Sequence, residues 1–164
     1  MNAISRKLMP VIVSALTVIA AAGCASSSAG MPGSGKMLGM ADSSKMQRIA
    51  TINLDGSHEV PPVNTSATAM GTITVAADKS VCGSIVTTGI DARAAHIHEG
   101  APGTNGPVII ALEKTADNTW SVPAGAMLTD AQYASYMAGN LYVNVHSAAY
   151  PNGEIRAQLN RSIT

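Results

Sequence analysis

The stretch LYVNVH at residues 141–146 decides the fold that we expect. Apolar and polar side chains alternate along it, with Leu141, Val143 and Val145 set against Tyr142, Asn144 and His146. Successive side chains of a β-strand point to opposite faces of the sheet. The alternation therefore predicts a strand with one apolar face, turned to a core, and one polar face that carries a histidine.

Further short segments of strand character are separated by turn residues. The strands expected outside residues 141–146 are residues 49–54, 69–76, 81–88, 93–98, 108–113 and 154–159. One helix is expected as well, because Thr129 and Gln132 have the spacing of a capping box and Gly139 is placed to end it. This pattern predicts an all-β fold, an antiparallel β-sandwich or flattened barrel with one short helix.

The composition and motifs exclude several functions. The 10 Lys and Arg residues balance the 10 Asp and Glu residues, and charged residues make up only 12% of the chain. Binding to nucleic acid is not expected, since it depends on clustered basic charge. No Gly-x-Ser-x-Gly elbow, P-loop or dinucleotide-binding glycine motif is present. We interpret Glu154 and Arg156, on the polar face of the last expected strand, as cross-strand charge partners and not as catalytic groups.

Residues 1–23 have the features of a lipoprotein signal peptide. Arg6 and Lys7 precede an apolar stretch, residues 11–22, that is too short to span a membrane stably. The sequence AAGC at residues 21–24 is similar to a bacterial lipobox, in which Cys24 becomes diacylated. The alternative is an ordinary signal peptide followed by an incidental cysteine.

A lipidated Cys24 implies a location in the cell envelope. More than one acyl chain on one residue suffices for stable anchoring to a membrane. Ala25, and not Asp, follows the cysteine, which by the usual bacterial sorting pattern indicates the outer membrane. We therefore expect a protein that is lipid-anchored at the periplasmic face of the outer membrane.

The segment 24–47 is expected to be a flexible tether, because it is rich in Ser, Gly and Ala. Its methionines lie in otherwise polar sequence: Met31, Met37, Met40 and Met46. Thioethers are ligands for Cu(I), so the tether could collect copper, and compositional drift is the alternative. The globular domain is expected over residues 48–161.

Histidines supply the candidate chemistry. In the expected strand 93–98, His96 and His98 share one face, and His146 lies on the polar face of the strand 141–146. Three imidazoles on neighbouring strands can converge on one metal ion, and neutral imidazole suits copper and zinc. The alternative is that these side chains only decorate a wet sheet face. The candidate metal ligands are His96, His98 and His146, for one copper ion per chain.

Three separated parts of the chain resemble the CHRD (chordin-type) domain. The matching motifs, in order, are LDG and EVPPV at 54–56 and 59–63, AHIHEG and GPV at 95–100 and 106–108, and LYVNVH and YPNGEIR at 141–146 and 150–156. The resemblance covers roughly residues 48–161. It implies an all-β domain, usually secreted and in bacteria often a lipoprotein or surface protein. His58 falls outside this pattern and receives no role.

A more local resemblance concerns copper/zinc superoxide dismutases. HIHEG at residues 96–100, followed by TNG at residues 104–106, is similar to their copper-binding strand and loop. Carried over, His96 and His98 correspond to the His-x-His pair and His146 to a distant third copper ligand. Residues 99–120 contain no histidine, so the bridging imidazole and the zinc ligands of that family are missing. The resemblance therefore implies a site for one metal ion at most, and it does not by itself imply dismutase activity.

Two classes of function stay open on the sequence. The first is a non-enzymatic, lipid-anchored periplasmic protein that binds one copper ion. The second is an adhesive or scaffolding module that binds an unidentified protein or the envelope without metal. A dismutase-like enzyme is the third and weaker alternative.

The lipid anchor gives the first testable prediction. The Cys24→Ser variant should incorporate no radiolabelled palmitate, because the thiol that accepts the diacylglycerol is gone, while the wild-type protein should be labelled and recovered with membranes. Labelling that persists in the variant would contradict the assignment of Cys24 as the lipidated residue.

Overall fold

The computed structural model describes residues 51–160. The expected signal peptide, residues 1–23, and tether, residues 24–47, lie outside the described residues, as does the start of the first expected strand. Within the described range, strands dominate and form two antiparallel sheets, with one short α-helix. The prediction of an all-β sandwich with a single short helix is confirmed.

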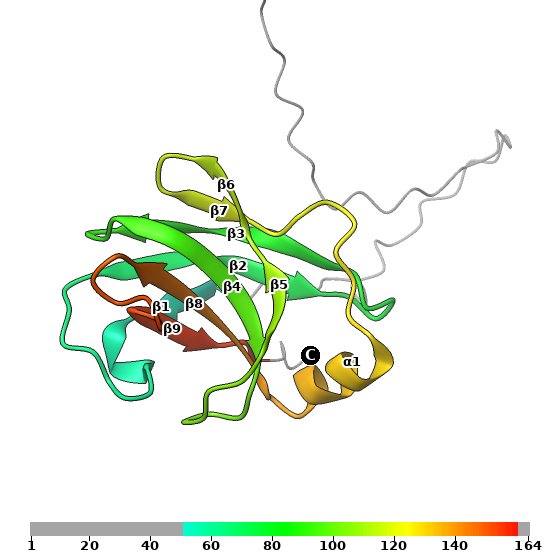
Figure 1. Cartoon of the computed structure of the whole chain (residues 1–164). Coiled ribbons are helices and arrows are strands. Elements are labelled where there is room, and N and C mark those ends of the chain that lie inside the picture. The colour runs from blue at the N-terminus through cyan, green and yellow to red at the C-terminus, as the bar shows by residue number, and fades with distance from the viewer. Residues whose placement is uncertain (1–50, 161–164) are drawn as a thin grey trace, which may run out of the picture. The chain divides into compact units, whose positions relative to one another are not determined.

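The two sheets form the two layers of the domain (Figure 1). The five-stranded sheet has the order β1 (Thr51–Leu54), β2 (Thr68–Val75), β3 (Val81–Thr88), β7 (Thr119–Ser121), β6 (Glu113–Ala116). The four-stranded sheet has the order β5 (Val108–Ala111), β4 (Ala92–Glu99), β8 (Leu141–Ser147), β9 (Ile155–Gln158).

The hydrophobic core lies between the sheets. From the four-stranded sheet, β4 contributes Ala95 and Ile97, and β8 contributes the apolar half of LYVNVH: Leu141, Val143 and Val145. The five-stranded sheet contributes Leu54, Ile85 and Trp120, among others. The three apolar side chains of β8 are fully buried, at 0% exposure. The prediction from the alternation in residues 141–146, that Leu141, Val143 and Val145 face the core, is therefore confirmed.

One edge of the sandwich is closed by a short backbone connection. Asp55, just after β1, pairs with Arg156 of β9 through two hydrogen bonds, with N···O distances of 3.3 and 2.9 Å. This bridge joins the first strand of one sheet to an edge strand of the other. It also fixes the backbone from which the Arg156 side chain projects.

The segment between residues 108 and 121 differs from the prediction. The single strand expected at 108–113 is two strands, because the chain crosses from one sheet to the other at Leu112, whose N–H donates to the Ala95 carbonyl at 2.9 Å. The hairpin of β6 and β7 was not predicted. All four residues of β6 are exposed. A strand with no buried face needs no alternation of apolar and polar residues, and that alternation is the pattern by which a strand is predicted.

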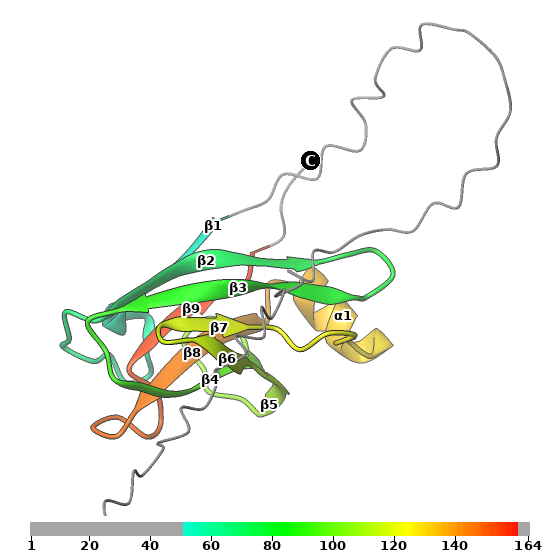
Figure 2. The ribbon, with the colours of Figure 1, turned by 90° about the horizontal axis from the view of Figure 1, so that it is seen from above.

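The helix α1, Asp130–Met137, begins and ends as predicted. The Thr129 hydroxyl accepts a hydrogen bond from the Gln132 backbone, and the Gln132 side chain accepts one from the Thr129 backbone, which completes the capping box. Gly139 has a φ of 77°, a left-handed conformation that ends the helix. Figure 2 shows α1 at one end of the two sheets. No helix in residues 51–160 has the length and apolar character needed to cross a membrane.

The core gives a prediction with a matched control. Val143→Ala should lower the free energy of unfolding by about 2–3 kcal/mol, because it removes two buried methyl groups and leaves a cavity. Val86→Ala, at a position that is 49% exposed on β3, should change it by less than about 0.5 kcal/mol. Urea unfolding of both variants measures the difference, and equal effects would contradict the core described above.

Candidate metal centre

The three candidate ligands lie on the outer face of the four-stranded sheet. His96 and His98 project from β4, and His146 projects from the neighbouring β8, opposite the face that enters the core. In the register of these antiparallel strands, His146 faces Ala94 and His96 faces Asn144. Across from His96 on the other side, β5 presents Ala111. The small side chains beside His96 and His146 leave room for the two rings to lean together.

The three imidazoles are close enough to hold one metal ion. One nitrogen from each ring lies within 4.8 Å of the others. The ring centroids are 4.8 Å apart for His96 and His146, and 5.6 and 6.1 Å for the pairs that include His98. Nitrogens bound to one ion at about 2 Å lie at most about 4 Å apart, so the widest spacing must contract by roughly 1 Å or less.

Two backbone carbonyls orient two of the rings. His98 Nδ1 donates to the Gly106 carbonyl at 2.9 Å, and His146 Nδ1 donates to the Pro151 carbonyl at 3.0 Å. A carbonyl only accepts, so the proton of each neutral ring is held on Nδ1 and the lone pair is left on Nε2. Hydrogen bonds of this kind fix the tautomer and direction of metal-binding histidines.

The third ring, His96, is held by another member of the group. His96 Nδ1 lies 2.9 Å from His146 Nε2. Because His146 Nε2 carries a lone pair, His96 Nδ1 is the donor. For both atoms to bind a metal ion, the proton of this hydrogen bond would have to lie on His96 Nε2 instead.

His98 carries an unsatisfied nitrogen. Its side chain is only 7% exposed, and Nε2 has no hydrogen-bond partner. Buried polar atoms are nearly always satisfied, so a buried lone pair without a donor calls for an unseen partner. Each of the other two rings has a nitrogen within 4.8 Å, and three imidazole nitrogens are a donor set that fits a metal ion.

Burial keeps all three rings neutral. The pKa of each is below the usual 6.5, and loss of solvation is the main cause for His96, His98 and His146 alike. Mutual repulsion between the rings adds to this for His96 and His146. Neutral imidazole is the form that binds metal, so the site is in its ligating state at neutral pH.

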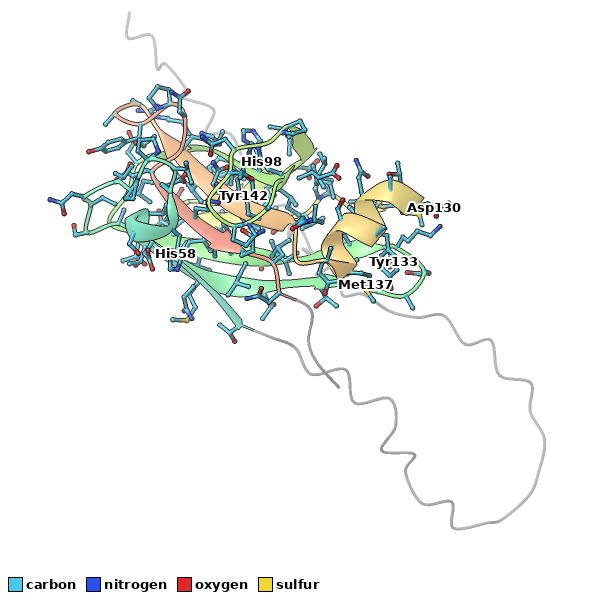
Figure 3. All side chains as sticks on the ribbon, turned by 90° about the horizontal axis from the view of Figure 1, so that it is seen from below. His58, His98, Asp130, Tyr133, Met137 and Tyr142 are labelled. Carbon is cyan, nitrogen blue, oxygen red and sulfur yellow. The ribbon has the colours of Figure 1, made fainter. Side chains whose placement is uncertain are left out.

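A stack of planar groups supports His98 from one side. The Tyr142 ring lies 4.8 Å from the His98 ring at an angle of 8°, and the Arg156 guanidinium carbon lies 3.3 Å from the centre of the Tyr142 ring. Arg156 is 1% exposed and donates to the Thr104 carbonyl at 2.8 Å. Figure 3 shows His98 and Tyr142 beside each other. The stack limits rotation of the His98 ring out of its plane.

Two further buried side chains lie next to this stack. Asn144, 3% exposed, is within hydrogen-bonding reach of His98 on one side and of Glu59, 5% exposed, on the other. Burial raises the pKa of Glu59, and the nearby positive charge of Arg156 opposes that increase. Gly153, at φ 127°, is required beside them, since a Cβ there would lie 2.6 Å from Glu59 Oε1 and 2.7 Å from Asn144 Nδ2.

The interpretation of Glu154 and Arg156 as cross-strand charge partners is wrong, because the contacts of both are with uncharged groups. Glu154 accepts a hydrogen bond from the Thr65 hydroxyl at 2.7 Å, while Arg156 stacks on Tyr142 and binds loop carbonyls. Three buried polar residues around the histidines had no predicted role: Glu59, Tyr142 and Asn144. Tyr142 and Asn144 were predicted to lie on the same strand face as His146. Their spacing of two residues along the strand was the sequence feature that pointed to a place beside the histidines.

At His98 the polar face of the sheet is covered and is not exposed to solvent. Loop residues around Gly106 cover it, and Gly106 approaches so closely that a Cβ there would lie 1.7 Å from the Glu99 carbonyl oxygen. His58 is not part of the cluster and lies on the short 3-10 helix η2, Gly56–His58, apart from His98 in Figure 3. It is exposed, and its Nδ1 lies 2.8 Å from Asp55 Oδ1.

The fold and site define an all-β domain with a cluster of three histidines on one covered sheet face. The sequence model of the CHRD domain matches residues 50–159, and the chain belongs to this family. The predicted membership is confirmed. No match is found among the curated proteins or among the solved structures. The likeness to the copper strand of superoxide dismutases remains a local one.

The lowered pKa values predict how the metal-free protein responds to pH. Because the folded state holds these imidazoles neutral, the unfolded state binds protons more readily below about pH 6.5. The histidine contribution therefore leaves stability unchanged above that pH, and lowers it as the pH falls through 6.5 toward the lower folded values. In the presence of a chelator, the melting temperature should fall between pH 7.5 and 5.5.

The variant comparison assigns this effect to the cluster. Replacing His98 by Gln should flatten the pH dependence, whereas His58→Gln should leave it unchanged, because His58 is exposed and lies outside the cluster. A melting temperature that rises as the pH is lowered through this window would contradict the neutral state of the cluster.

Proposed function

We propose that the protein binds a single copper ion through His96, His98 and His146 and does not act as an enzyme. The observation that carries the proposal is the buried, unsatisfied Nε2 of His98, which lies in a group whose ligand nitrogens are within 4.8 Å of one another. In the other two rings, His96 Nδ1 and His146 Nε2 lie 2.9 Å from each other.

The donor set favours copper over other divalent ions. All three ligands are neutral imidazoles, which suit copper and zinc and are poor ligands for magnesium or calcium. Among first-row divalent metals, copper binds a given nitrogen site most tightly. The two carbonyl acceptors on His98 and His146 act as outer-shell partners and increase ligand basicity.

The residues support holding a metal and not dismutation. The chain has 4 histidines, and the fourth, His58, is exposed and paired with Asp55. No further imidazole is therefore placed to bridge a second ion. The role of the chain's own residues is to present three lone pairs, exclude water from His98 and release metal when the rings take up protons.

The envelope location belongs to the same proposal. The lipobox-like sequence before Cys24 supports a lipid anchor, and the methionines of the segment 24–47 would supply soft ligands near the membrane. In this arrangement the protein binds copper in the periplasm while attached to the outer membrane.

Copper titration tests the proposal. Metal-free protein prepared without a histidine tag should bind about one copper per chain. His98→Ala should weaken binding by more than about 100-fold, since even loss of an outer-shell partner costs 10–100-fold. His58→Ala should change it by less than about twofold. Competition with a chromophoric chelator measures both affinities, and elemental analysis gives the stoichiometry.

The outcomes separate the candidate functions. Equal losses in His98→Ala and His58→Ala would show that the binding is nonspecific. Stoichiometric zinc with no preference for copper would overturn the identity of the metal. Protein that binds no metal would leave the binding or scaffolding module as the function.

A further inference from the structure

Asn144 occupies the middle of the histidine cluster. It lies directly across from His96 in the β4–β8 register, two residues before His146 on β8, and diagonal to His98, which pairs with Tyr142. Side chains directly opposite on neighbouring strands have Cβ atoms about 4.5–5.5 Å apart, and diagonal ones remain within reach of long side chains. Asn144 is therefore the side chain that all three imidazoles adjoin.

Glu59 determines which way the Asn144 amide points. Asn144 is within hydrogen-bonding reach of both Glu59 and His98, and Asn144 Nδ2 and Glu59 Oε1 both lie beside Gly153. Glu59 Oε1 is buried without a donor, and the nearest amide atom of Asn144 is the NH2 nitrogen, so the NH2 group is the one that faces the carboxyl group. The carbonyl oxygen Oδ1 then faces the other way, toward His98.

This orientation places two buried acceptors together without a donor. Asn144 Oδ1 and His98 Nε2 are both buried and both lack a hydrogen-bond partner. The Nδ1 proton of His98 is already given to Gly106, so Nε2 has a lone pair and nothing to donate. Two facing lone pairs in a buried site are unfavourable unless a proton, a metal cation or a water molecule lies between them, and burial opposes the proton by lowering the pKa of His98.

We propose that Asn144 Oδ1 is a fourth ligand of the bound ion, and that Glu59 holds it in position. The inference rests on the copper site proposed above and adds an oxygen donor to its three nitrogens. A set of three imidazoles and one carbonyl oxygen matches the tetragonal N,O ligation of Cu(II). Because oxygen is a harder ligand than imidazole, Asn144 favours Cu(II) over Cu(I), which needs no fourth ligand.

The first test replaces the oxygen and compares the two oxidation states. Asn144→Leu should lower Cu(II) affinity at least about tenfold and leave Cu(I) affinity within about threefold. A tenfold loss on Cu(II) alone raises the reduction potential by about 59 mV. Asn53→Leu is the matched control, since Asn53 is an exposed strand residue of β1 on the other sheet, and it should change neither affinity. Equal losses for both oxidation states would overturn the proposal, because they indicate a structural role.

The second test concerns Glu59. Glu59→Gln replaces an acceptor-only neighbour by an amide that can also donate, so the orientation of Asn144 is no longer fixed. The Cu(II) affinity should fall by a smaller factor than in Asn144→Leu. Unchanged Cu(II) binding would remove Glu59 from the proposal.

The third measurement uses the wild-type chain and does not depend on a variant that folds. Protein labelled with 13C-asparagine and loaded with Cu(II) should show a 13C hyperfine coupling by pulsed electron paramagnetic resonance. If copper binds without this coupling, and with the signal of an exchangeable water, the fourth ligand is water and the inference fails while the copper site stands. If the wild-type chain binds no copper at all, the proposed function itself fails.

Discussion

Burial of β8 on both faces is the constraint on which the rest of the domain depends. Its apolar side chains fill the core at 0% exposure, and on the opposite face Tyr142 and Asn144 are only 2% and 3% exposed. A polar side chain that is buried must be hydrogen-bonded or bind an ion. The outer face of the four-stranded sheet therefore has to carry a matched set of polar partners, and the loops that supply those partners also cover the histidines.

Arg156 connects these loops to the sheet. A buried guanidinium is costly unless its donors are satisfied, and Arg156 achieves this with the Thr104 carbonyl, Asn105 Oδ1 and the face of Tyr142. These contacts hold the loop over the sheet next to Gly106, whose carbonyl orients His98. The geometry of the candidate metal site thus depends on a cation that does not touch the ligands.

The sequence predicted those features that depend on local periodicity. Alternation in residues 141–146 placed the core face and the His146 face correctly, and the spacing of Thr129, Gln132 and Gly139 placed the helix. It missed the β6–β7 hairpin, whose exposed strand has no apolar period. It could not show that the polar face is covered, since the contact of Arg156 with Thr104 joins residues 52 positions apart. The roles of Glu59 and Asn144 depend on that cover and were therefore missed with it.

The metal-free cluster is already close to a binding geometry. Two of its rings are fixed by backbone carbonyls, and the third is fixed by the hydrogen bond from His96 to His146. Binding an ion then requires one proton to move from Nδ1 to Nε2 of His96, together with a contraction of roughly 1 Å or less at the widest spacing. Because so little has to be reorganised, little binding free energy is lost to ordering the ligands. Protonation of the rings is then the main competitor of a metal ion, since a protonated imidazole has no lone pair to offer.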